Sequence, residues 1–383
     1  MPHTSEECTG QHCNGFHPSS LQCFDAAGDQ EVESEETDLP LVSLIMPILN
    51  VEHFLDAMLA SLLLQTYQGP MELSIYDDSS TDGSLKVLER NRPTLEKRMI
   101  VLLVSKGEEG RPPQGCGFGR NVAVRQCHGE YLCFADADDI MHPERIELQL
   151  RLARQSSKLL VGSDFVREPA DATPRYTEWL NSLSQAQLYT QQLVECTIIH
   201  PTWFCSRAVY DAVGGYVEEG PGTPDDLIFF YKHLRLGGYL AKVEKPLVTY
   251  TYHGASVTGQ RGVDWQKIWA VRVAHLETQL LPHEPWGNGF TIWNAGKEGK
   301  RLYRSLNAAN QSKVLAFCDV DGKKLKRGSF HVPETNVRVP ILHWSVAQTP
   351  LLLCVKRGLT GGAFERNLDS LHLQEGLDYV FFS

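Results

Sequence analysis

Short apolar runs alternate with segments of helical spacing between Leu41 and Ala135, and this alternation restricts the possible folds of the 383-residue chain most. Apolar runs of this length predict strands, and leucines at helical spacing after Asn50 predict a helix that Asn50 caps. The strands are expected at 41–46, where Pro47 closes the first, and at 71–76, 99–104 and 131–135. Alternating strands and helices predict an α/β fold with a doubly wound, mostly parallel sheet, which binds ligands at the carboxyl ends of its strands.

Charge and composition divide the chain into three parts. Residues 1–40 have a net charge of -9 and no Lys or Arg, which predicts a disordered acidic tail over 1–39. Cys8, His12, Cys13, His17 and Cys23 in this tail match no common zinc-finger spacing. Residues 40–285 are predicted to form the main domain. Residues 286–383 have a net charge of +5 and predict a small Rossmann-like α/β domain.

The cellular compartment is inferred from segments that the sequence lacks. No run of 18 or more apolar residues is present, so no membrane span is expected. The first residues do not combine a basic start with an apolar stretch, so no secretory signal is expected either. The ten cysteines are scattered and are interpreted as reduced thiols. These features together predict a cytoplasmic protein.

Acidic clusters stand where predicted strands or loops end. They are Asp77-Asp78, Asp136-Ala-Asp138-Asp139 and Asp225-Asp226. Three carboxylates packed at a buried strand end are costly unless a cation is bound. In an extended chain, the Asp-Ala-Asp alternation would direct two carboxylates to one side, as a divalent metal requires. For Asp226 alone, the simpler interpretation is an acid that a helix dipole favours.

Several motifs in one order resemble the inverting nucleotide-sugar glycosyltransferases of family two. The resemblance spans about 41–260 and is strong because the motifs occur together. They are Val42–Glu52, Ser61–Tyr67, Asp77–Ser84, Gly119–Ala123, Gly129–Asp139, Gly214–Tyr216, Pro224–Leu227 and Tyr250–His253. The resemblance implies a GT-A fold, a nucleotide-diphosphate sugar donor, a divalent metal (Mn or Mg) and inversion at the anomeric carbon. The sequence departs from the family at Leu49, where many members have Tyr.

The same resemblance implies roles for individual residues. Asp226 corresponds to the general base, with Asp225 beside it. Asp136, Asp138 and His253 correspond to the metal site, although a loop histidine bonded only within the protein is an equally good interpretation of His253. The residues implied to bind the nucleotide sugar are Pro47, Asn50, Glu52, Asp77, Asp78, Arg120, Asn121 and Asp136.

Motifs outside the general family pattern resemble galactosyltransferases that modify tRNA. They are Pro201–Arg207, Phe229–Tyr231, Phe290–Lys297, Phe317–Asp321 and Leu359–Glu365. This resemblance implies UDP-galactose as the donor and queuosine in the anticodon of tyrosine tRNA as the acceptor. The alternatives are a cytosolic transferase with a protein or small-molecule acceptor, and an inactive module that only binds sugar nucleotides.

The C-terminal part has two further features with two interpretations each. Asn294-Ala-Gly296-Lys-Glu-Gly299 is an incomplete dinucleotide fingerprint, and Asp319 follows where a ribose-binding acid belongs. Basic residues flank the same turn and form either a solvated face or a track for tRNA phosphates. These residues are Lys297, Lys300, Arg301, Arg304, Lys323, Lys324, Lys326 and Arg327.

Overall fold

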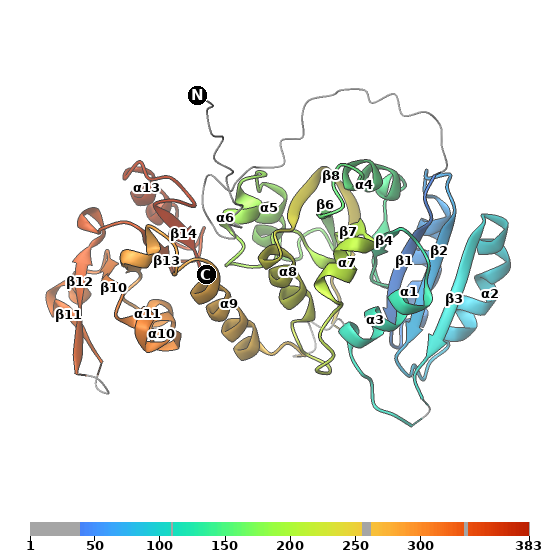
Figure 1. The fold of residues 1–383 in the computed structure, drawn as a ribbon, viewed down its shortest axis with the longest axis horizontal. Helices are drawn as coiled ribbons and strands as arrows, with labels where there is room; N and C mark the ends of the chain where they lie inside the picture. Colours follow the sequence, from blue (N-terminus) through green and yellow to red (C-terminus); the bar gives the residue numbers. More distant parts are fainter. Residues whose placement is uncertain (1–38, 109, 255–261, 333–335, 383) are drawn as a thin grey trace, which may run out of the picture.

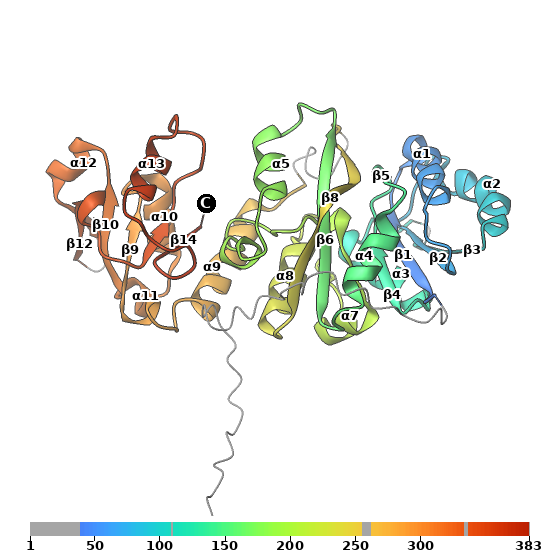
Figure 2. The ribbon, with the colours of Figure 1, turned by 90° about the horizontal axis from the view of Figure 1, so that it is seen from above.

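The computed structural model describes residues 39–108, 110–254, 262–332 and 336–382. Two α/β units follow one another along the chain, each built around its own sheet. They lie at opposite ends of the molecule, with helix α9 (Trp265–Gln279) between them (Figure 1). The view from above shows the same arrangement (Figure 2). The predicted disordered tail and its cysteines fall almost entirely on 1–38, outside the described residues.

The first unit contains an eight-stranded sheet in the order β3-β2-β1-β4-β7-β6-β8-β5. Strands β3, β2, β1 and β4 are parallel, as are β6 and β8, whereas β7 and β5 run antiparallel to their neighbours. The strands are β1 (Val42–Ile48), β2 (Met71–Asp77), β3 (Ile100–Lys106), β4 (Tyr131–Phe134), β5 (Ile140–Met141), β6 (Leu159–Glu168), β7 (Phe204–Ser206) and β8 (Tyr239–Thr251).

Helices cover both faces of this sheet. Their bounds are α1 (Glu52–Leu63), α2 (Ser84–Lys97), α3 (Cys116–Gln126), α4 (Arg145–Ala153), α5 (Pro174–Asn181), α6 (Gln187–Thr190), α7 (Arg207–Val213) and α8 (Asp225–Arg235). In β1, Leu44 and Met46 pack with α1, α2 and α4, whereas Ile45 packs with α3, α7 and α8. Successive strand residues face opposite sides, and a strand buried on both faces is a continuous apolar run. The predicted doubly wound sheet is therefore confirmed.

Two predicted details of the first strand and helix are wrong. Strand β1 continues through Pro47 to Ile48. The proline is tolerated because β4 pairs only with Val42–Ile45, so the missing N–H of Pro47 removes no hydrogen bond between β1 and β4. Asn50 does not cap α1, whose N-cap residue is Val51. The Asn50 side chain instead accepts a hydrogen bond from the Thr81 backbone N–H at 2.8 Å.

The second unit contains a six-stranded sheet in the order β11-β12-β10-β9-β13-β14, in which only the edge strand β11 is antiparallel. Its strands are β9 (Phe290–Trp293), β10 (Val314–Asp319), β11 (Ser329–Val332), β12 (Val337–His343), β13 (Leu351–Leu353) and β14 (Tyr379–Phe381). Its helices are α10 (Lys297–Ser305), α11 (Ala308–Gln311), α12 (Gly322–Arg327) and α13 (Ala363–Asp369). This arrangement is the α/β, Rossmann-like unit that the sequence predicts.

Helix α9 belongs to the packing of both units. Its residues Val273 and Leu276 lie in the apolar core of the second unit together with Phe290. On the side of the first unit, the ring of His275 stacks on Tyr231 of α8 with centroids 3.7 Å apart. The predicted boundary at residue 285 stays a prediction. Among the helices of the described ranges, none is both long and apolar enough to cross a membrane.

Candidate active site

Three segments that are distant in sequence meet around Arg120 of α3. Arg120 Nη1 lies 2.8 Å from Asp225 Oδ2 at the start of α8, and Nη2 lies 3.6 Å from Asp136 Oδ1, just after β4. Burial opposes the charge on Arg120, but the carboxylates of Asp225 and Asp136 outweigh this effect and raise its pKa. The structure thus brings together three of the predicted site residues.

Asp226 stands beside this cluster in the first turn of α8 and is only partly buried. Its Oδ1 accepts a hydrogen bond from the backbone N–H of Leu227 at 2.7 Å. Burial and the negative charges of Asp225 and Glu195 raise the pKa of Asp226 to about 7. A carboxylate with a pKa near neutrality can accept a proton at physiological pH and hold it during the reaction.

The acidic run after β4 is not extended, which corrects the geometric argument made from the sequence. Residues Asp136–Asp139 form a turn, in which the Asp139 N–H donates to the Asp136 carbonyl at 3.3 Å. As a result, Asp136 faces Arg120 while Asp138 faces His253. Burial raises the pKa of Asp136, and burial with the nearby Asp136 and Asp138 raises that of Asp139.

Asp138 and His253 form the part of the site best suited to a metal. His253 Nε2 lies 2.8 Å from Asp138 Oδ2, and the imidazole stacks on Phe54 of α1. Asp139 Oδ1 accepts from the Thr251 N–H, while its buried Oδ2 has no hydrogen-bond partner. Carboxylate and imidazole donors, with an unsatisfied carboxylate oxygen behind them, fit a divalent cation. Within the described ranges, however, no three His, Cys, Asp or Glu side chains are already grouped to hold one.

Asp77 and Asp78 are buried at the end of β2 and hold loops. Asp78 Oδ1 accepts from the Gln114 N–H and Oδ2 from the Gly115 N–H, both at 2.8 Å. Asp77 Oδ1 accepts from the Ser80 N–H at 3.3 Å. Direct contact between these acids and a nucleobase stays a prediction. In this structure, Asp78 fixes the loop that leads into α3.

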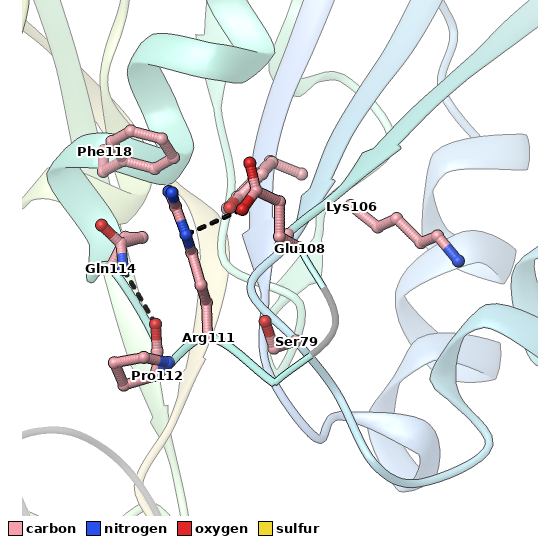
Figure 3. A pocket seen from close by; sticks show the side chains of 9 residues that line it. Ser79, Lys106, Glu108, Arg111, Pro112, Gln114 and Phe118 are labelled. Carbon is pink, nitrogen blue, oxygen red and sulfur yellow. Dashed lines mark hydrogen bonds and ion pairs between the residues drawn. The ribbon is translucent and has the colours of Figure 1, made fainter.

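A cavity of about 170 Å³ opens next to this loop, and its side chains come from β2, β3, the following loop and α3 (Figure 3). Tyr76 and Phe118 meet edge to face, and Arg111 pairs with Glu108 at 2.8 Å. The volume is below the roughly 300–1,000 Å³ of pockets that enclose a drug-sized ligand, so it suits a single ring. The sequence analysis did not identify these residues. The sequence signal that could have indicated this cavity is the position of Tyr76 directly before Asp77.

Three other predicted binding residues act on the protein itself in this structure. Glu52 Oε2 accepts from the Gly83 N–H at 2.8 Å, which joins the starts of α1 and α2. Asn121 Oδ1 accepts from the Tyr216 N–H, and its Nδ2 donates to the Tyr216 carbonyl. Pro47 lies against Gly119, where an added Cβ would come within 2.7 Å of the proline Cβ. All three position the segments that carry the site.

Glu195 is a further residue that the sequence analysis missed. Its Oε2 lies 2.7 Å from Arg272 Nη2 on α9, and its negative charge contributes to the raised pKa of Asp226. An isolated Glu outside all of the recognised motifs gives no sequence signal for this role. The ion pair connects α9 to the surroundings of Asp226.

The incomplete fingerprint in the second unit folds as a strand, a turn and a helix. Asp319, the predicted ribose-binding acid, has its Oδ2 2.9 Å from the Ala295 N–H and 2.7 Å from Lys324 Nζ. Gly299 is required, because an added Cβ would lie 1.9 Å from the Asn294 carbonyl oxygen. These contacts account for Asp319 and Gly299 without a nucleotide.

Comparison with known proteins finds a family match for most of the first unit. Residues 43–214 match the family described as "Glycosyl transferase family 2". We call this segment, which is similar to glycosyl transferase family 2, the family 2 domain. It contains β1 to β7, with Arg120, Asp136 and Asp138, whereas Asp225, Asp226 and His253 follow it. The α/β architecture expected of a GT-A fold is therefore found together with the family match.

Relatives of the family 2 domain are glycosyltransferases. An uncharacterized glycosyltransferase of Haemophilus influenzae is 30% identical over 128 residues, which cover 33% of this chain and 48% of the relative. The poly(ribitol-phosphate) beta-N-acetylglucosaminyltransferase TarS of Staphylococcus aureus is 33% identical over 106 residues, 27% of this chain and 17% of that protein. The chain thus spans less than half the length of these curated relatives.

The solved structures of S. aureus TarS include a complex with UDP-GlcNAc. This structure has a TM-score of 0.49 and 19% sequence identity, and the comparison covers 75% of this chain and 76% of that one. A mannosyltransferase from Pyrobaculum calidifontis in complex with GDP-Man and Mn2+ has a TM-score of 0.44 and 18% identity, with coverage of 64% and 66%.

Proposed function

We propose that the protein is an inverting glycosyltransferase that transfers a sugar from a nucleotide diphosphate to an acceptor hydroxyl, with Asp226 as the general base. The observation that carries this proposal is the meeting of Asp136, Arg120, Asp225 and Asp226 within and just after the family 2 domain. The raised pKa of Asp226, about 7, supports its role because a base of this strength works at neutral pH.

The proposed reaction is a single displacement. The acceptor oxygen attacks the anomeric carbon while Asp226 takes the hydroxyl proton. The bond between the anomeric carbon and the phosphate oxygen breaks, and the nucleoside diphosphate leaves with the bonding electron pair. Arg120 holds Asp225 in place beside the base and keeps a positive charge between Asp225 and Asp136. The cavity near Tyr76 and Phe118 is the proposed place of the nucleobase.

Asp138 and His253 are the residues that would hold a divalent metal, with Asp136 nearby. Such an ion, when bound, neutralises charge on the diphosphate leaving group. Carboxylate and imidazole donors are compatible with Mn²⁺ or Mg²⁺. The protein's own contribution is to orient these two side chains, since Phe54 stacks against the imidazole and the turn after β4 directs Asp138 toward it.

For the donor and acceptor we propose galactose from UDP-galactose and queuosine in the anticodon of tyrosine tRNA. This finer assignment rests on the motifs outside the general family pattern, such as Pro201–Arg207 and Phe290–Lys297. The contrast between the positive second unit and the rest of the acidic chain is compatible with an RNA acceptor. A cytoplasmic location accompanies this proposal.

The experiment incubates the purified protein with radiolabelled UDP-galactose, UDP-glucose or UDP-GlcNAc and Mn²⁺. Each donor is tested with total tRNA, with protein extract and with buffer alone. Label from UDP-galactose in tyrosine tRNA supports the full proposal. Label in the protein extract would show that the acceptor is a protein. Donor binding without any transfer would indicate an inactive sugar-nucleotide-binding module.

A further inference from the structure

A basic pocket lies at the edge of the second sheet, away from the family 2 domain. Its volume is about 340 Å³, and its lining comes from α10, the end of α12, and strands β11 and β12. We define the basic pocket by Lys300, Arg327, Ser329, Phe330, His331 and Arg338. His331 and Arg338 are directly paired across the two strands, so their side chains stand on one face of the sheet edge.

Lys300 of the basic pocket and the neighbouring Arg304 both lie close to one aromatic ring. Lys300 Nζ lies 5.2 Å and Arg304 Cζ 5.4 Å from the centroid of Phe330, which is buried. Burial, together with the positive charges of Arg327, Arg304 and Lys324, lowers the pKa of Lys300. Positive charges held close together disfavour one another's charged forms and raise the free energy of the protein there. A bound anion would lower that free energy.

The ion pairs of the described residues leave these cations available. Within the described ranges, no carboxylate lies within salt-bridge distance of Lys300, Arg304, Arg327 or Arg338. Lys324, by contrast, pairs with Asp319 at 2.7 Å. The pocket therefore differs from an ordinary surface in which Lys and Arg alternate with acids. An oxyanion with several acceptor oxygens, such as a phosphate, matches this set of donors.

The position of the pocket favours a long ligand over a small one. The strands β11 and β12 stand at the end of the molecule opposite α2 and β3 (Figure 1). Further exposed cations stand on the two helices that border the pocket, namely Lys297 and Arg301 of α10 and Lys323 and Lys326 of α12. More cations than a single phosphate requires are typical of contacts to a nucleic-acid backbone.

We infer that the basic pocket binds backbone phosphates of an RNA acceptor while another part of that RNA reaches Asp226. This inference rests on the proposed function for the identity of the acceptor, but the binding itself does not require sugar transfer. Arg327 and Arg338 are exposed and hold the phosphates, and Lys300 supplies a third charge from the floor of the pocket.

The test measures binding of fluorescein-labelled tRNA by anisotropy at several salt concentrations. The double variant Arg327→Gln/Arg338→Gln is compared with Lys356→Gln/Arg366→Gln, which removes two exposed positive charges from the same unit outside the pocket. We expect the pocket variant to bind on the order of tenfold or more weakly at about 50 mM salt. In a plot of the logarithm of the tRNA binding constant against the logarithm of salt concentration, the slope should become less steep by about one unit for each lost phosphate contact. The control variant should stay within about twofold of the wild type.

Two outcomes would contradict the inference, and a third would contradict only the proposed acceptor. If tRNA binding were weakened equally in both double variants, the affinity would depend only on the net charge of the protein and not on the basic pocket. Wild-type tRNA affinity in the pocket variant, combined with loss of inorganic phosphate binding by calorimetry, would assign the pocket to a small phosphorylated ligand. If tRNA binds through the pocket but accepts no sugar, the pocket stands and the proposed acceptor fails.

Discussion

At the scale of single residues, the site depends on how neighbouring charges set the proton affinity of Asp226. Burial raises the pKa of Asp226 most, the negative charges of Asp225 and Glu195 raise it further, and the positive charge of Arg120 lowers it. Glu195→Gln removes one of the raising charges, so we expect the pKa of Asp226 to fall. The pH at which kcat reaches half its maximum should move to lower pH, as measured by initial rates between pH 5 and 9. Glu147→Gln, at an exposed ion pair on α4, is the control, and an unchanged midpoint in Glu195→Gln would contradict this coupling.

Asp138 permits a separate test of the metal site. Asp138→Asn removes the carboxylate that faces His253, so we expect loss of turnover and weaker donor binding in the presence of Mn²⁺. Titration calorimetry with UDP-galactose, with and without Mn²⁺, checks this expectation. Asp56→Asn, at an exposed ion pair, should behave as the wild type. If Mn²⁺ strengthened donor binding equally in Asp138→Asn, the metal would be held elsewhere.

At the scale of elements, the site requires α3 to lie very close to β1. Gly119 permits this, because a Cβ there would lie 2.7 Å from Pro47 Cβ and 3.1 Å from Tyr76 Cδ1. Gly119→Ala should therefore destabilise the protein by about 1–3 kcal/mol, as overpacking does. Urea denaturation measures this change. Gly322→Ala, where the added Cβ meets open space, should change stability by no more than about 0.5 kcal/mol. Equal effects of the two variants would refute the close-approach argument.

The elements that the sequence predicts best are those with an unambiguous apolar run. Strands β1, β2 and β4 fall where the runs predict them, because strands buried on both faces need continuous apolar sequence. The turn at Asp136–Asp139 was not predicted, because its i to i+3 hydrogen bond has no sequence signature among three carboxylates. The pairing of Arg120 with Asp225 spans 105 positions, and only tertiary structure reveals it.

At the scale of the whole molecule, α9 ties the two units together. Leu276 of this helix is fully buried in the core of the second unit, about one turn from Arg272, which pairs with Glu195. Leu276→Ala should cost about 2–5 kcal/mol, as expected for a large-to-small change in a core. Leu236→Ala, at a side chain 51% exposed at the end of α8, is the control and should be nearly neutral. Calorimetric unfolding checks both variants, and a neutral Leu276→Ala would contradict the packing of α9 into that core.

The central claim is that ionised Asp226 accepts the acceptor's proton. The most direct test is kcat between pH 5 and 9 for the wild type and Asp226→Asn, with UDP-galactose and tRNA. The account predicts that wild-type kcat rises about tenfold per pH unit below about pH 7 and then levels off, because only the carboxylate form acts as base. Asp226→Asn should be slower by at least about 10²-fold, with no pH step near 7 and little change in donor affinity. A variant with wild-type kcat, or one that retains the step near pH 7, would contradict the account.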